Sequence, residues 1–112
     1  MLARVNRLVR AEDYRNVVRR GRRVVGKNTV VYLFPSDEPC GVRFGFITAR
    51  SVGGAVVRNR VRRRLKAICA LELPHVKEGT DIVIRALPGS STASWVTLQS
   101  EVVRGISKGS GT

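Results

Sequence analysis

The chain has 112 residues, the size of one domain, and 43% of them are hydrophobic, which is enough to build a packed core. Its 21 Lys and Arg residues outnumber its 8 Asp and Glu residues, so the formal charge is +13 at pH 7. These values exclude a disordered basic tail and indicate a polyanionic partner, with nucleic acid favoured over an anionic membrane surface.

The sequence favours a cytoplasmic protein with no membrane contact. No apolar run reaches the length of a membrane span, and the basic N-terminus lacks the hydrophobic block of a signal peptide. The two cysteines have neither zinc-ligand spacing nor a disulfide-rich context; Cys40 is predicted in a loop, and Cys69 as a buried thiol on a helix. We therefore expect a single domain over residues 1–112.

The N-terminal part is predicted to hold a basic arm over residues 1–10 and then a short helix. Two acids in the first turn favour a helix over residues 11–20, which Gly21 is predicted to end. Tyr14 and Val17 lie on its apolar stripe, which is about two turns long.

Two strands are predicted next, over residues 28–34 and 43–48, and a hairpin between them is expected. The first is rich in β-branched and aromatic residues. Alternation places Val30, Tyr32 and Phe34 on one of its faces. The opposite face is also apolar, so either both sides are covered or one side awaits a ligand.

The C-terminal half is predicted to contain a helix over residues 55–73, a strand over 80–86 and a last helix capped by Ser91 or Thr92. The last helix has an apolar stripe in which Trp95 is expected in the core: Trp95, Leu98, Val102 and Ile106. A Gly/Ser-rich tail, residues 108–112, is expected to be flexible.

The predicted order of elements is αββαβα. The strand–helix–strand unit over residues 43–86 favours a parallel strand pair, because a helix is the usual connection between parallel strands. The fold class is therefore α+β, with helices packed against a small mixed sheet.

The predicted helix over residues 55–73 separates apolar from cationic side chains. At about 100° per residue, one arc holds Val57, Val61, Leu65 and Ile68. The opposite side holds Asn59, Arg62, Arg63 and Lys66, with Arg58 and Arg60 at the edges of the apolar arc. No acid occurs in this helix before Glu72, so ion pairs cannot neutralise the charge from within. Because arginine can grip phosphate with two hydrogen bonds, the pattern predicts nucleic-acid binding rather than a solvated face.

Residues 45–65, GFITARSVGGAVVRNRVRRRL, resemble the signature of the bacterial ribonuclease P protein subunit, in which an RNR block follows a glycine-bearing turn. The block here is Arg58-Asn59-Arg60. Further similar segments follow the family's order over nearly the whole chain: Asn6-Arg7-Leu8, Glu12-Asp13-Tyr14, Gly21, Val30-Val31-Tyr32 and Ile82-Val83-Ile84-Arg85.

The resemblance implies an α-β sandwich whose βαβ crossover is left-handed, although connection rules alone favour the right-handed form. It also implies a protein component of ribonuclease P, which assists removal of the 5′ leader from precursor tRNA. The RNA subunit would perform the cleavage with Mg²⁺ that it binds mainly itself, so neither catalytic nor metal-binding residues are expected in this chain. The expected partners are that RNA and precursor tRNA, without an obligate protein partner.

The resemblance also assigns two sets of binding residues. Those expected at the RNA subunit are Arg50, Arg58, Asn59, Arg60, Arg62, Arg63 and Lys66. Those expected in a cleft for the single-stranded leader, between the first helix and the sheet, are Tyr14, Val18, Val30 and Tyr32. Aromatic faces suit a leader because stacking tolerates any base. Two departures from the family pattern bear on leader affinity: Val18 replaces a frequent second aromatic, and Ala49-Arg50-Ser51 replaces the usual Ser-Lys-Lys.

Three other functions compete with this interpretation. A small ribosomal-type RNA-binding protein has the same composition and is separated only by the ordered motifs. A protein nuclease would need clustered carboxylates or a His/Glu pair, and the eight acids form no such pattern along the sequence. Membrane binding is disfavoured because the basic helix lacks bulky interfacial aromatics.

Overall fold

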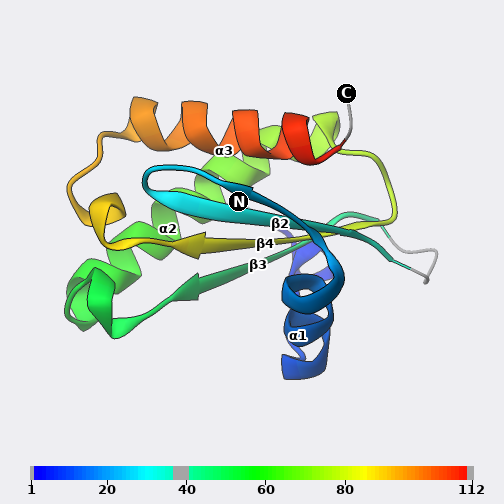
Figure 1. The fold of residues 1–112 in the computed structure, drawn as a ribbon, viewed down its shortest axis with the longest axis horizontal. Coiled ribbons are helices and arrows are strands. Elements are labelled where there is room, and N and C mark those ends of the chain that lie inside the picture. Colours follow the sequence, from blue (N-terminus) through cyan, green and yellow to red (C-terminus); the bar gives the residue numbers. More distant parts are fainter. Residues whose placement is uncertain (1, 37–40, 111–112) are drawn as a thin grey trace.

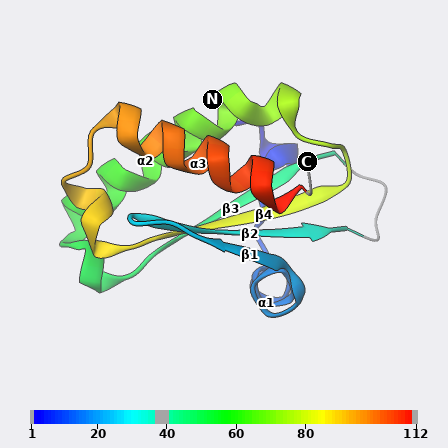
Figure 2. The same cartoon turned by 45° about the horizontal axis from the view of Figure 1, so that its top comes forward.

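The computed structural model describes residues 2–36 and 41–110. A four-stranded sheet forms the middle layer, with α2 (Ala55–Glu72) and α3 (Trp95–Gly109) on one face and α1 (Ala11–Arg20) on the other (Figures 1 and 2). The strands are β1 (Arg22–Val25), β2 (Thr29–Pro35), β3 (Arg43–Thr48) and β4 (Thr80–Ala86). Short 3₁₀ turns are η1 (Arg4–Asn6), η2 (Arg50–Val52), η3 (Leu73–His75) and η4 (Pro88–Ser91).

The sheet is mixed, with the strand order β1-β2-β4-β3. The predicted parallel pair is confirmed, since β3 runs parallel to β4. The predicted hairpin between the strands over residues 28–34 and 43–48 is wrong, because β4 lies between β2 and β3 and pairs with both. Ile82, Val83 and Ile84 are completely buried, so β4 needs the central place where both of its faces are covered.

Strand β1 was not predicted from the sequence, and it forms the actual hairpin with β2. Two of its four residues are arginines, and three of the four are exposed. Charged residues on a short strand are typical of a sheet edge, where they discourage pairing with other chains. The main elements thus follow the predicted order αββαβα, with β1 added after α1.

Each face of the sheet has its own hydrophobic core. Val31 and Leu33 face α2 and α3, while Val30 and Tyr32 face α1, as the alternation predicted. The larger core contains the buried side of α2, which includes Val61. Both faces of β2 are therefore covered.

The predicted basic arm is packed against the sheet. Leu2 and Leu8 are buried, and the backbone N–H of Leu8 donates to the carbonyl oxygen of Phe44 at 2.8 Å. Arg7 forms a parallel bridge with Phe44. The apolar residues of the arm thus hold it beside β3, at the edge opposite β1.

Helix α1 has the predicted bounds, but Gly21 ends it for a different reason. Its φ of −76° is open to any residue. A Cβ atom there would lie 2.8 Å from the carbonyl oxygen of Leu33, so glycine allows the end of α1 to approach β2 closely.

The last helix differs from its prediction at both ends. Its N-cap is Ser94, whose hydroxyl accepts from the backbone N–H of Thr97 at 3.1 Å, instead of Ser91 or Thr92. Trp95 is half-buried and packs against the larger core. The helix continues to Gly109, so the start of the predicted flexible tail is helical; residues 111–112 lie outside the described residues, as does Cys40.

Helix α2 follows a 3₁₀ turn and the extended residue Gly54, and it ends one residue earlier than predicted, where Pro74 lies in the following 3₁₀ turn. Within the described residues, no helix combines the length and apolar character needed to cross a membrane.

Candidate nucleic-acid interface

The outer side of α2 carries a shallow hollow lined mainly by cations. Val56, Asn59, Arg62, Arg63 and Lys66 enclose a volume of about 320 Å³, which we call the α2 hollow. These positions recur every three or four residues and therefore lie along one side of the helix. The opposite side of α2 is buried in the larger core. Apolar packing thus fixes the direction in which the cations point.

Arg62 is held in place by two neighbours. One terminal nitrogen donates to Asn59 Oδ1 at 3.0 Å, and the other donates to Thr48 Oγ1, at the end of β3, at 2.6 Å. Both acceptors are neutral, so neither of them offsets the positive charge of Arg62. The contacts restrict its rotamers before any ligand binds, which lowers the entropy cost of binding.

Two other arginines of α2 reach towards the turn before α3. Arg60 donates to the carbonyl oxygen of Ser91 at 3.1 Å, and Arg64 donates to that of Ala93 at 3.2 Å. Arg60 nevertheless remains exposed. Of the predicted RNA-subunit set, Arg60 therefore lies at this edge of the helix, and four members line the α2 hollow: Asn59, Arg62, Arg63 and Lys66.

Arg58 and Arg50 complete the predicted set outside the hollow. Arg58 is half-buried, and its Nε atom is buried without a hydrogen-bond partner among the described residues. Arg50 is exposed in η2, just before α2 begins.

A second depression lies between α1 and the sheet. Tyr14, Arg15, Val18, Arg19 and Ile47 enclose about 320 Å³, and we call this depression the α1 groove. Its surface combines an aromatic ring and aliphatic side chains with two exposed arginines. Apolar surface beside cations suits a strand of bases and phosphates.

Tyr14 is positioned by the sheet beneath it. Its hydroxyl donates to the carbonyl oxygen of Leu8 and accepts from the backbone N–H of Phe46, both at 3.3 Å. The ring lies over Gly45, where an added Cβ atom would come 2.5 Å from a ring carbon. Only glycine at position 45 therefore leaves room for the Tyr14 ring to lie against β3.

The four predicted leader residues belong to one cluster but differ in exposure. Tyr14 and Val18 are half-buried and line the α1 groove, whereas Val30 and Tyr32 are 7% and 5% exposed on the sheet behind them. Three residues of the groove were not predicted from the sequence: Arg15, Arg19 and Ile47. The spacing of Arg15 and Arg19, one turn apart and next to Val18, is the signal that could have identified them.

Two acids, Asp13 and Asp81, are held by Arg43. Asp81 accepts from Arg43 Nε at 2.9 Å and from its Nη2 at 2.7 Å, and Asp13 lies 3.6 Å from Arg43 Nη1. Within residues 2–36 and 41–110, no group of three or more His, Cys, Asp or Glu side chains could hold a metal ion.

Cys69 is buried in the larger core, as predicted. Burial, with a smaller contribution from the charge of Glu72, raises the pKa of its thiol far above the ordinary value. A neutral thiol is a poor nucleophile, so Cys69 has a packing role.

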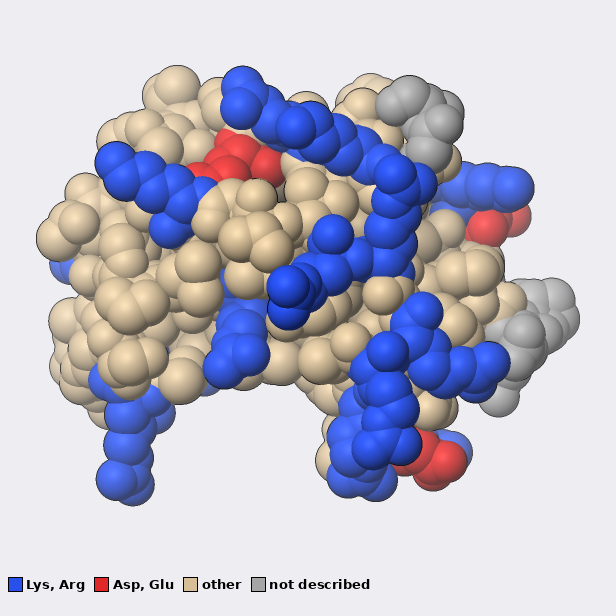
Figure 3. Space-filling view, viewed as in Figure 1, with Lys and Arg blue, Asp and Glu red and all other residues tan. Residues whose placement is uncertain are grey.

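The cations extend beyond these two depressions. Figure 3 shows a band of Lys and Arg side chains from α3 across β1 to α1, with few acids on this face. With a net charge of +13, such a surface attracts a polyanion from several directions.

Comparisons with known proteins show to which family the chain belongs. The family model described as Ribonuclease P matches residues 2–109. The ribonuclease P protein component of Clavibacter michiganensis subsp. michiganensis is 48% identical over 108 residues, which are 96% of each chain. That of Acidothermus cellulolyticus is 49% identical over 105 residues, covering 93% of this chain and 88% of the relative.

Solved structures share the fold. The RNase P protein of Staphylococcus aureus has a TM-score of 0.82 at 21% identity, covering 92% of this chain and 93% of that one. The RNase P protein of Thermotoga maritima has a TM-score of 0.80 at 20% identity, covering 91% and 96%. The chain therefore belongs to the ribonuclease P protein family, the protein components of an endoribonuclease that processes the 5′ ends of tRNA.

Proposed function

We propose that this chain uses two surfaces within ribonuclease P. The α2 hollow binds the catalytic RNA subunit, and the α1 groove binds the single-stranded leader of precursor tRNA. The observation that carries the proposal is the presence of two separate depressions with different chemistry. One is mainly cationic and lies on α2, and the other combines aromatic, aliphatic and cationic groups beside α1.

The contacts of each surface support its assigned ligand. In the α2 hollow, Arg62 and Arg63 offer planar guanidinium groups that match phosphate oxygens in folded RNA. In the α1 groove, Tyr14 and Val18 offer apolar surface for bases, while Arg19 offers a charge for the backbone. Leader sequences differ, and stacking accepts any base.

Cleavage itself belongs to the RNA subunit in this proposal. Phosphodiester hydrolysis needs metal ions that activate water and stabilise the leaving oxygen. Asp13 and Asp81 are engaged with Arg43, and the cationic surface disfavours free Mg²⁺. The protein instead lowers repulsion between RNA phosphates, so the RNA's own metal sites fill at lower Mg²⁺ concentration.

The test compares two variants in two assays. Arg62→Ala is expected to weaken assembly with the RNA subunit by ~1–3 kcal/mol, because a charged contact is lost. Tyr14→Leu keeps most of the apolar volume but removes the aromatic face, so it should weaken binding of leader-bearing tRNA and leave assembly nearly unchanged. Tyr32→Ala is less suitable, because truncating an aromatic that is only 5% exposed also destabilises the fold.

Arg4→Ala is the matched control for the arginine variant, since Arg4 is exposed in η1 and lines neither depression. It should change both affinities little. Equal losses for Arg62→Ala and Tyr14→Leu in both assays would contradict the two-surface proposal.

A further inference from the structure

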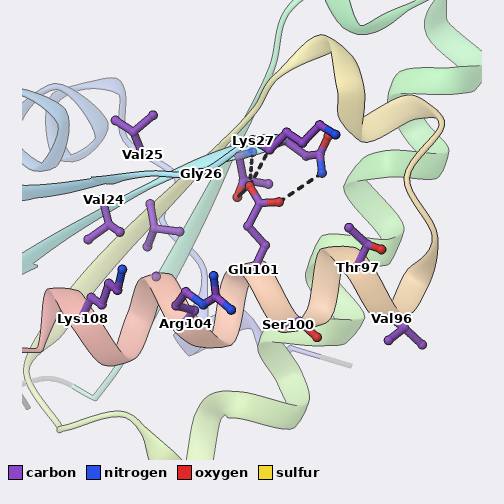
Figure 4. A pocket seen from close by; sticks show the side chains of 14 residues that line it. Val24, Val25, Gly26, Lys27, Val96, Thr97, Ser100, Glu101, Arg104 and Lys108 are labelled. Atoms are coloured by element: carbon purple, nitrogen blue, oxygen red, sulfur yellow. Dashed lines mark hydrogen bonds between the residues drawn. The ribbon is translucent and has the colours of Figure 1, made fainter.

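A third groove lies on the side of the molecule that neither proposed surface uses. It runs between α3 and the β1–β2 hairpin and encloses about 430 Å³, more than either depression described above (Figure 4). We call it the α3 groove. Its lining includes Val24, Val25, Lys27, Val96, Arg104 and Lys108.

One aliphatic side chain faces the helix across the α3 groove. Val24 pairs across the strands with Val31, which belongs to the core beneath α3, so Val24 faces the helix. Val25 pairs with Val30 and therefore points to the other face of the sheet, and Val96 points away from the hairpin (Figure 4). The apolar surface inside the groove therefore comes from Val24, which is half-buried.

Three exposed cations border this apolar surface. Arg104 and Lys108 lie one turn apart and rise from α3 towards the hairpin, and Lys27 lies at the hairpin turn (Figure 4). In the described part of the chain, none of the three forms a salt bridge. Their charges are available to an anionic ligand.

The one acid in the groove is fully engaged by the hairpin. Glu101 Oε1 accepts from the backbone N–H groups of Asn28 and Thr29, both at 2.7 Å, and from Thr29 Oγ1 at 2.9 Å. Its Oε2 accepts from Asn28 Nδ2 at 3.1 Å. These bonds hold the hairpin against α3, so the groove is formed before a ligand arrives.

We propose that the α3 groove binds a segment of single-stranded RNA, as a third RNA contact beyond the two surfaces of the proposed function. The cations contact phosphates, and Val24 contacts a base face. A single strand carries one charge at every nucleotide, so a short segment meets Lys27, Arg104 and Lys108 together. RNA supplies both the charge and the flat apolar surface.

The test is nuclear magnetic resonance of the full-length, ¹⁵N-labelled protein titrated with an oligouridylate of about eight nucleotides. Glycine amides report the surfaces separately. Gly26 and Gly105 line the α3 groove, Gly45 lies under Tyr14 in the α1 groove, and Gly54 precedes α2. We expect Gly26 and Gly105 to shift and to saturate with their own dissociation constant.

Substitutions then test the cations of the groove. Lys108→Ala should weaken the dissociation constant read at Gly26 and Gly105 by about fivefold and reduce its salt slope by about 1. The constants read at Gly45 and Gly54 should stay unchanged. Lys77→Ala is the matched control, because Lys77 is an exposed lysine outside the three depressions.

Two outcomes would overturn the proposal. The first is a titration that saturates at Gly45 or Gly54 without any amide shift at Gly26 and Gly105. Shifts at Gly26 and Gly105 that Lys108→Ala and Lys77→Ala weaken equally would count in the same way. The second comes from an oligoglutamate of equal charge: binding at Gly26 and Gly105 as tight as that of the oligouridylate would assign the groove to acidic peptides. If the α2 hollow or the α1 groove did not bind RNA, the amide shifts of Gly54 or Gly45 would be absent. Failure of the proposed function can therefore be distinguished from failure of the α3-groove proposal.

Discussion

Replacing Gly45 with alanine should damage the α1 groove through a single added methyl group. The new Cβ atom would lie 2.5 Å from a ring carbon of Tyr14, whereas carbon atoms in contact prefer about 3.5–4.0 Å. The ring must therefore retreat by roughly 1 Å or more. Its hydroxyl would then lose the 3.3 Å bonds to Leu8 and Phe46 that hold it in place.

The expected magnitude has two parts. Overpacking should lower the free energy of unfolding by about 1–3 kcal/mol, which thermal or urea unfolding measures. Losing one stacking face should weaken binding of leader-bearing precursor tRNA by about 1–3 kcal/mol, while tRNA without a leader binds as before. The assay is a titration of both RNAs with the assembled complex of this chain and a bacterial RNase P RNA.

Gly41→Ala is the control for the glycine-to-alanine change itself. Among the described residues, a Cβ atom there would meet only Asn6 Nδ2, at 4.0 Å, so leader binding should be unchanged. Unaltered leader affinity in a folded Gly45→Ala protein would refute the assignment of Tyr14 to the leader.

Three further predictions concern stability, affinity and charge. Glu101→Ala should lower the free energy of unfolding by about 3–5 kcal/mol in urea, because the buried N–H groups of Asn28 and Thr29 lose their acceptor. Glu101→Gln keeps an acceptor oxygen and should cost clearly less. Equal losses for the two variants would contradict the role of Glu101 in holding the hairpin against α3. Because the raised pKa keeps the Cys69 thiol neutral in the fold, the free energy of unfolding should fall by about 1.4 kcal/mol per pH unit above pH ~8.5, and Cys69→Ala should remove that slope. Val18→Phe should strengthen leader binding by supplying a second aromatic face, and no gain would mean that this side of the groove is closed to the leader.

Salt dependence tests the polyanion contacts as a whole. Sixteen of the 21 cations lie in two blocks of sequence, nine within residues 4–27 and seven within 50–66. If about six contact phosphates, log affinity for RNA should fall against log salt with a slope of roughly −4 to −5. A slope shallower than about −2 would contradict extensive phosphate contact.

The periodic spacing of apolar and charged residues predicted which side of a helix or strand is buried. The apolar arc of α2 predicted both its buried side and the direction of Arg62 and Arg63, because a helix fixes the relative positions of its residues. The β2 pattern likewise predicted that Val31 and Tyr32 face different cores. The leader-binding set and the left-handed crossover came from family resemblance rather than from periodicity, and both remain predictions.

Features that depend on distant residues could not be predicted this way. The pairing of β2 with β4 depends on competition among strands for a central place, which local alternation does not encode. The hydrogen bonds that hold the β1–β2 hairpin against α3 join Glu101 to Asn28, 73 residues away, and they shape the α3 groove. The packing of the Tyr14 ring against Gly45 likewise depends on a contact between α1 and β3.

The central claim is that the RNA performs the cleavage and that this chain positions RNA and substrate. Its most direct test is single-turnover cleavage of precursor tRNA by a bacterial RNase P RNA across a range of Mg²⁺ concentrations, with and without this protein. We predict that the protein alone does not cleave, and that its rate enhancement is largest at low Mg²⁺ and shrinks as Mg²⁺ rises. Cleavage by protein freed of RNA, lost when a single carboxylate such as that of Asp13 is changed to its amide, would contradict the account.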